Sequence, residues 1–134
     1  MSNSSRIETK SPAKLNLSLE VIGLLENGYH EICSIMQAIS IYDDITIELH
    51  SDLILSCSEQ SINGGNNLVY KVASKLRNTY RVTLGANIHI QKKIPLSSGL
   101  GGGSSNAATV LNGLNELWDL DLSRQELMNI GSEF

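Results

Sequence analysis

The chain of 134 residues is long enough for one compact domain and leaves little room for a second. Apolar residues make up 41% of it and charged residues 18%, proportions that are ordinary for a globular protein with a buried core. A net charge of −4 argues against a nucleic-acid-binding protein with a strongly basic surface, and no run approaches the ~18 apolar residues of a membrane-spanning helix. The N-terminal residues lack an apolar signal segment, so we expect a cytoplasmic protein.

Strand patterns dominate the first half of the chain. Alternating or continuous apolar and β-branched residues predict strands at 15–22, 32–41, 45–49 and 53–58. We expect the first of these to be half-buried and the second to be buried. Asn27 and Gly28 predict a hairpin turn, because both residue types tolerate positive φ. Asp43 and Asp44 are interpreted as turn residues between two strands.

Helical spacing appears in the second half. Apolar residues recur at intervals of three and four, which predicts helices over 68–78, 107–118 and 123–130, with a strand at 86–91. Asn67 is a candidate N-cap for the first helix, and Ser123 with Glu126 has the spacing of a capping box for the third. Strands followed by helices that alternate with strands indicate the α+β class.

A glycine- and serine-rich segment lies between the strand at 86–91 and the second helix. Glycine lets the backbone curl around an anion, and the start of a helix offers unpaired N–H groups and the positive end of its dipole. Lys92 and Lys93 place positive charge nearby, so a nucleotide phosphate is the natural ligand. The segment is neither a GxxxxGK[ST] loop nor a GxGxxG fingerprint, since Ser104 stands where the last glycine would be. A flexible connector is the alternative.

The segment PLSSGLGGGSSNAA, residues 95–108, resembles the phosphate-binding motif of the GHMP family of small-molecule kinases, which includes galactokinase, homoserine kinase and mevalonate kinase. Three further segments resemble parts of the same family in the same order: SPAKLNLSLEV (11–21), NGYHEICSIMQAISIYDDITIE (27–48) and NNLVYKVASKL (66–76). The resemblance implies the family's N-terminal ATP-binding domain over residues 1–134. That domain has a mixed, mostly antiparallel sheet with helices on one side.

The resemblance also implies a function and roles for particular residues. The implied reaction is the ATP- and Mg²⁺-dependent phosphorylation of the 2-hydroxyl of a cytidine diphosphate-linked methylerythritol, in non-mevalonate isoprenoid synthesis. Lys14 would be catalytic, and Ser105 would contact the metal. Asn16, Tyr29 and His30 would bind the substrate, the last two at its cytidine end. ATP would be bound by Asn67, Lys92, Pro95, Leu96, Ser97, Ser98, Gly99, Leu100, Gly101, Gly102, Gly103, Ser104 and Ser105. On the residues alone, Lys14 is better interpreted as an exposed strand lysine, and Tyr29 and His30 as turn residues.

The resemblance stops before the family's catalytic aspartate, which lies in a Gly-x-Asp-Val-Pro-like motif, and before its second domain. We therefore expect an N-terminal portion of a kinase that is weakly active or inactive by itself. Such a portion would be prone to associate, with a homodimer among the alternatives. Two other hypotheses stay open. One is a mevalonate or homoserine kinase, against which the Gly28-Tyr29-His30 segment argues. The other is a non-catalytic anion-binding module, for which RNA binding is disfavoured by the acidic balance.

Overall fold

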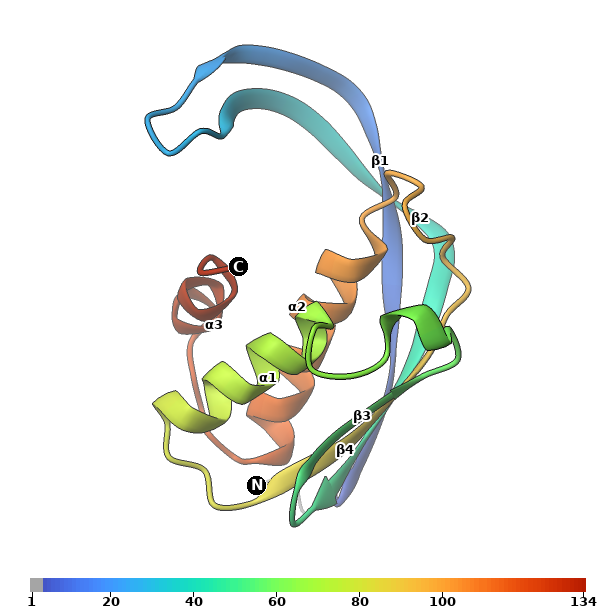
Figure 1. Cartoon of the computed structure of the whole chain (residues 1–134), viewed down its shortest axis with the longest axis vertical. Helices are drawn as coiled ribbons and strands as arrows, with labels where there is room; N and C mark the ends of the chain where they lie inside the picture. Colours follow the sequence, from blue (N-terminus) through green and yellow to red (C-terminus); the bar gives the residue numbers. More distant parts are fainter. Residues whose placement is uncertain (1–3) are drawn as a thin grey trace.

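A four-stranded sheet with helices on one face forms the framework of the protein (Figure 1). The computed structural model describes residues 4–134. Its elements, in chain order, are β1 (Arg6–Leu24), β2 (His30–His50), β3 (Leu53–Cys57), the 3₁₀ helix η1 (Gln60–Ile62), α1 (Leu68–Thr79), β4 (Gly85–Gln91), α2 (Gly102–Leu117) and α3 (Arg124–Gly131). Among the described helices, none is both long and apolar enough to cross a membrane.

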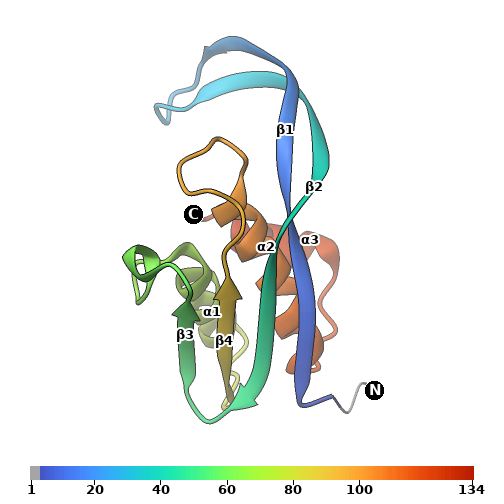
Figure 2. The ribbon, with the colours of Figure 1, turned by 90° about the vertical axis from the view of Figure 1, so that its right-hand side faces the viewer.

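The strand order is β1-β2-β4-β3, as Figure 2 shows from the sheet side. β1 pairs with β2 and β2 pairs with β4 in antiparallel fashion, whereas β3 and β4 are parallel and are connected through α1. The prediction of a mixed, mostly antiparallel sheet with helices on one side is confirmed. The core lies between the sheet and the helices, where Ile45, Ile47 and Ile88 are fully buried against Leu76 and Leu114.

Local sequence signals predicted the starts of α1 and α3 correctly. The side chain of Asn67 accepts a hydrogen bond from the backbone N–H of Val69, so it caps α1 as predicted. The predicted capping box of Ser123 and Glu126 is present at the start of α3. The second helix starts earlier than predicted, at Gly102, because glycines in its first turn take up helical conformation once Gly101 has turned the chain.

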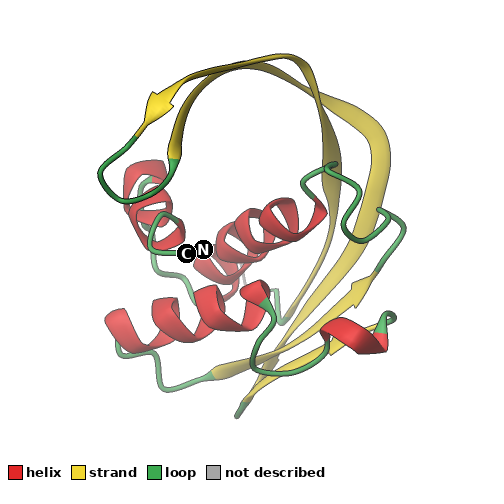
Figure 3. Ribbon diagram, turned by 45° about the horizontal axis from the view of Figure 1, so that its top comes forward, coloured by secondary structure: helices red, strands yellow, loops and turns green. Residues whose placement is uncertain are grey.

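The outer parts of β1 and β2 form a two-stranded extension, residues 13–39, which we call the hairpin arm. It curves over the helices (Figures 1 and 3) and turns through Gly28 at a φ of 84°, which confirms the predicted hairpin. The arm begins at a register shift between Pro12 and Ala13, next to a proline that has no N–H to donate to the ladder.

The prediction of burial for residues 15–22 and 32–41 was wrong. Both segments are strands, but β4 pairs with β2 only between Asp44 and His50, so within residues 4–134 the two arm strands pair only with each other. Leu17 is 64% exposed and Leu24 is 71% exposed. The alternation of apolar residues therefore does mark strands, but the described part of this chain provides no layer that packs on their apolar side chains.

The interpretation of Asp43 and Asp44 as turn residues was also wrong. Both lie inside β2, which continues without a break from the arm into the sheet. Asp43 is fully buried there, at the end of the pairing between β2 and β4. Its carboxylate accepts hydrogen bonds from the backbone N–H groups of Lys93 and Ile94, which follow β4, so it replaces the next step of the strand ladder.

Candidate functional site

The glycine loop, residues 92–101, connects the end of β4 to the start of α2. Ser97, Gly99 and Gly101 have φ values of 53°, 74° and 70°, so the backbone turns sharply three times within five residues. Gly101 is the N-cap of α2, and the first backbone N–H that closes a helical bond is that of Ser105, on the carbonyl of Gly101. The preceding N–H groups of the first turn have no acceptor within the helix, as an anion site requires.

Lys14 fastens this loop to β1. Its backbone N–H donates to the carbonyl of Leu100 at 2.8 Å, and its Nζ donates to the carbonyl of Gly99 at 3.0 Å. A Cβ atom at Gly101 would lie 2.9 Å from Cγ and Cε of Lys14, so glycine permits this close approach. The ammonium of Lys14 therefore lies next to the loop that leads into α2.

A cavity of about 450 Å³ opens between this loop, η1 and the start of α1. Five of the residues predicted to bind ATP line it: Asn67, Lys92, Leu96, Ser97 and Gly103. The remaining lining residues are Ser61, Ile62, Asn63, Asn66, Leu68 and Asn106. The cavity thus combines an apolar patch, several amides and one ammonium next to the first turn of a helix, a set of groups that suits a nucleotide.

A buried ionic cluster of Asp43, Lys92 and Asn106 lies at the wall of the cavity. The Nζ atom of Lys92 lies 2.5 Å from Oδ2 of Asp43, and it also donates to Oδ1 of Asn106 at 3.1 Å. Burial by itself raises the pKa of Asp43. Hydrogen bonds from the Ile94 backbone, the Lys92 ammonium, the Lys93 backbone and Asn106 outweigh that effect, so the pKa of Asp43 lies below its ordinary value. The carboxylate is therefore ionised and holds Lys92 in place.

Ser105, the predicted metal contact, lies in the first turns of α2. Its Oγ accepts a hydrogen bond from Oγ of Ser11 on β1, at 2.8 Å. The residues described here contain no group of three or more His, Cys, Asp or Glu side chains that could hold a metal ion by themselves. A hydroxyl at a phosphate loop suits Mg²⁺, which is commonly held by few protein oxygens together with phosphates and water.

The three residues predicted to bind substrate all lie on the hairpin arm. Asn16 and Lys14 share one face of β1, since the register between them is unbroken, and Oδ1 of Asn16 accepts a hydrogen bond from Ser34. Tyr29 and His30 lie at the tip of the arm, and Tyr29 is 71% exposed. The structure thus brings Asn16 near Lys14 and separates Tyr29 and His30 from the glycine loop along the arm.

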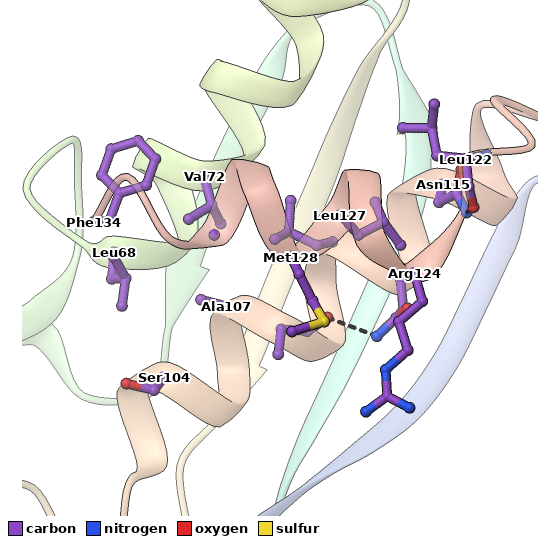
Figure 4. Close-up of a pocket in the computed structure, with 14 residues that line it drawn as sticks. Leu68, Val72, Ser104, Ala107, Asn115, Leu122, Arg124, Leu127, Met128 and Phe134 are labelled. Atoms are coloured by element: carbon purple, nitrogen blue, oxygen red, sulfur yellow. Dashed lines mark hydrogen bonds between the residues drawn. The ribbon is translucent and has the colours of Figure 1, made fainter. Parts of the chain in front are cut away.

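A larger cavity of about 700 Å³ lies between α1, α2 and α3 (Figure 4). Its walls are mainly apolar, with Val72, Leu127 and Met128 among them. Ser104 is the one residue of the predicted site that lines it. Since the predicted polar groups gather around the smaller cavity, that cavity is the better candidate for the functional site.

Comparison with known proteins gives these features a context. The family model described as the GHMP kinases N terminal domain matches residues 67–134, which is half of the chain and includes α1, the glycine loop and α2. The chain belongs to the GHMP kinase family. The resemblance seen in the glycine loop is thereby confirmed.

Two curated relatives that resemble the chain closely carry the same name. The chain is 47% identical over 130 residues to the 4-diphosphocytidyl-2-C-methyl-D-erythritol kinase of Caldicellulosiruptor bescii, and 50% identical over 129 residues to that of Alkaliphilus oremlandii. These alignments cover 95% and 94% of this chain but only 46% and 44% of the relatives. The chain thus spans about half the length of the curated relatives it matches.

Solved structures agree with the fold. A crystal structure of 4-(cytidine 5'-diphospho)-2C-methyl-D-erythritol kinase matches with a TM-score of 0.76 at 34% identity, over 93% of this chain and 46% of that one. A homoserine kinase from Cytophaga hutchinsonii matches with a TM-score of 0.75 at 17% identity, over 99% of this chain and 42% of that one. The second comparison shows the shared fold of the GHMP kinases alone.

Sequence reasoning missed three buried residues that lie at the cavity wall or behind it. Asp43, Asn106 and Ser11 are each at most 2% exposed and are joined by hydrogen bonds, although they come from three separate segments. The one available signal was Asp43 itself, a carboxylate flanked by β-branched runs that continue on both sides. Such a residue either lies in a turn or is a buried anion with hydrogen-bond partners. The partners of Asp43 are distant in sequence, so the sequence does not show which of the two applies.

Proposed function

We propose that residues 1–134 form the ATP-binding domain of a kinase that phosphorylates the 2-hydroxyl group of 4-diphosphocytidyl-2-C-methyl-D-erythritol. The observation that carries the proposal is the 450 Å³ cavity, where Asn67, Lys92 and the glycine loop converge beside the unpaired N–H groups of α2. The choice of substrate is supported by the name that the two curated relatives described above share and by the Gly28-Tyr29-His30 turn at the tip of the arm.

Phosphoryl transfer needs mainly positioning and stabilisation of charge. The backbone N–H groups at the start of α2 would bind the phosphates of ATP, and the turns at Gly99 and Gly101, with φ values of 74° and 70°, would lead the chain into this first turn. Asn67 and Lys92 would contact the adenosine part in the cavity. Mg²⁺, when bound, would neutralise phosphate charge, and Ser105 would be its protein ligand.

On the other side of the loop, Lys14 is placed to act on the reacting hydroxyl. Its Nζ bonds an exposed carbonyl, that of Gly99, which is a weak interaction that an anionic ligand can replace. Lys14 would orient the substrate alcohol and stabilise the charge that develops there. Asn16, on the same face of β1, would hold the substrate next to it, and Tyr29 with His30 would bind the cytidine, Tyr29 by stacking and His30 by hydrogen bonding.

The test is calorimetric titration of the full-length kinase, first with a nonhydrolysable ATP analogue plus Mg²⁺ and then with the cytidine-containing substrate. Gly101→Val should abolish nucleotide binding, because its side chain would meet Lys14 and its φ of 70° disfavours a β-branched residue. Tyr29→Ala should abolish substrate binding while nucleotide binding is kept, and Tyr29→Phe, which retains the ring, should bind like the wild type. A folded protein that binds neither ligand would contradict the proposal.

A further inference from the structure

Ser11 is a fully buried serine on β1 that contacts the start of α2. Its Oγ accepts a hydrogen bond from Nδ2 of Asn106 at 3.0 Å and lies 2.8 Å from Oγ of Ser105. Ser11 begins the segment 11–21, but none of the functional roles described above is assigned to it. The directions of its two hydrogen bonds can be worked out from its neighbours.

The amide of Asn106 has a fixed orientation. Its Oδ1 accepts from the ammonium of Lys92, which can only donate, and its Nδ2 donates to the carboxylate of Asp43, which can only accept. If the two amide atoms were exchanged, the amide nitrogen would face the ammonium of Lys92 and the amide oxygen would face the carboxylate of Asp43, and neither contact would be a hydrogen bond. The second hydrogen of Nδ2 therefore points to Ser11, and the Ser11 oxygen is the acceptor of that bond.

The Ser11 hydroxyl hydrogen must also have a partner, because a buried O–H group without one is costly. Within residues 4–134, the acceptor that the structure gives it is Oγ of Ser105. Ser105 therefore accepts a hydrogen bond from the protein interior. Its own O–H group is free to donate in another direction, and one lone pair stays available.

We propose that Ser11 is a positioning residue that makes the Ser105 hydroxyl a hydrogen-bond donor to the phosphates of the bound nucleotide. The relay runs from Asp43 through Asn106 and Ser11 to Ser105, and each step is fixed by the one before it. The inference rests on the proposed function, since it names the ligand as a nucleotide phosphate. Ser11 acts through Ser105 and does not touch the ligand.

The test is a double-mutant cycle in the full-length protein, with binding of AMP-PNP plus Mg²⁺ and of adenosine as the two readouts. Ser11→Ala should weaken AMP-PNP binding roughly threefold to tenfold, the effect of about one hydrogen bond, and leave adenosine binding unchanged. On a Ser105→Ala background, Ser11→Ala should have no further effect on AMP-PNP binding. Ser56→Ala is the control, because Ser56 is a strand serine bonded to the side chain of His89 and does not line the cavity.

Two results would overturn the inference while leaving the proposed function intact. One is an equal loss of AMP-PNP and adenosine binding in Ser11→Ala, and the other is an additive effect in the double variant. If Ser11→Ala does not fold, Ser11→Cys, which keeps the shape but donates weakly, should give the same selective loss, and wild-type affinity for AMP-PNP in that variant would also overturn the inference. A wild-type protein that binds no AMP-PNP would instead overturn the proposed function and the inference with it.

Discussion

Asp43 and Lys92 form an ion pair with an oxygen–nitrogen distance of 2.5 Å, and their side chains are 0% and 7% exposed. One residue lies in β2 and the other follows β4, so the pair joins the point where two strands diverge. Lys92 also lines the candidate nucleotide cavity. The Nζ atom of Lys92 lies beside the first turn of α2, 3.1 Å from the position that a Cβ atom on Gly102 would take, and the carboxylate of Asp43 holds this positive charge in place.

Replacing Asp43 by Asn should strongly destabilise the protein. The substitution leaves a buried ammonium without its counter-ion, which typically costs about 3–5 kcal/mol of unfolding free energy. The additional change Lys92→Met should recover part of that loss, since no buried charge then remains. Urea unfolding of the single and double variants measures both effects.

The neighbouring residue supplies a matched control for this prediction. Asp44 pairs with Lys93 and Lys10, but its side chain is 40% exposed and those of its partners more so. Asp44→Asn should therefore change the unfolding free energy by at most about 1 kcal/mol. Equal losses of unfolding free energy in the two variants would show that the buried Asp43–Lys92 pair stabilises the protein no more than the exposed pairs of Asp44 do.

The stability of the protein should fall in acid, and Asp43 should be a main cause. Its pKa is lower in the folded than in the unfolded state, so the folded state binds the proton less readily and protonation favours unfolding. The stabilisation from this group is complete well above its unfolded pKa of about 3.9 and is lost as the pH falls through its lower folded pKa. Unfolding free energies measured between pH 7 and pH 3 should therefore decrease below about pH 5, and the decrease should be smaller in Asp43→Asn. An unchanged slope in that variant would assign the acid sensitivity to other carboxylates.

The parts of this structure that depend on local signals could be predicted from the sequence. Asn67 at the start of α1, Ser123 at the start of α3 and the turn at Gly28 each act within a few residues, and each was found where expected. The glycine loop is also a local feature, because its φ values and the uncapped, glycine-rich start of α2 are properties of one continuous segment.

The parts that depend on distant partners could not be predicted. The burial of Asp43 depends on Lys92, two backbone N–H groups and Asn106, which are about 50 and 60 residues away. The exposure of the hairpin arm depends on which layer covers it, and alternation in residues 15–22 specifies a face without specifying what packs on it. For the same reason, the positions of Tyr29 and His30 relative to the glycine loop could not be predicted, because they depend on how the arm curves.

Gly85→Ala should destabilise the sheet. A Cβ atom at Gly85 would lie 2.2 Å from the backbone carbonyl carbon and oxygen of Asp52, and backbone cannot move aside as a side-chain end can. Gly85 also accepts the hydrogen bond from the indole N–H of Trp118, so a shift of β4 would disturb the core. We expect a loss of roughly 2–4 kcal/mol in urea unfolding. Gly23→Ala is the control, because that strand glycine has no atom within 4 Å of the new Cβ, and it should change the stability by less than about 1 kcal/mol.

Asn67 should contribute separately to stability and to nucleotide binding. Asn67→Ala removes the cap of α1, which should cost about 1 kcal/mol of unfolding free energy, and it also removes an amide from the cavity wall. Asn67→Ser should retain the cap but lose the hydrogen bond that Nδ2 donates to the carbonyl of Ile62, so it should recover only part of the stability and should still weaken binding of the ATP analogue. Ser123→Ala, which removes the equivalent cap of α3 far from the cavity in sequence and outside its lining, should lower the stability by a similar amount and leave binding unchanged. Calorimetric titration and urea unfolding of the three variants separate the two roles, and full nucleotide affinity in Asn67→Ser would show that the amide acts on the helix alone.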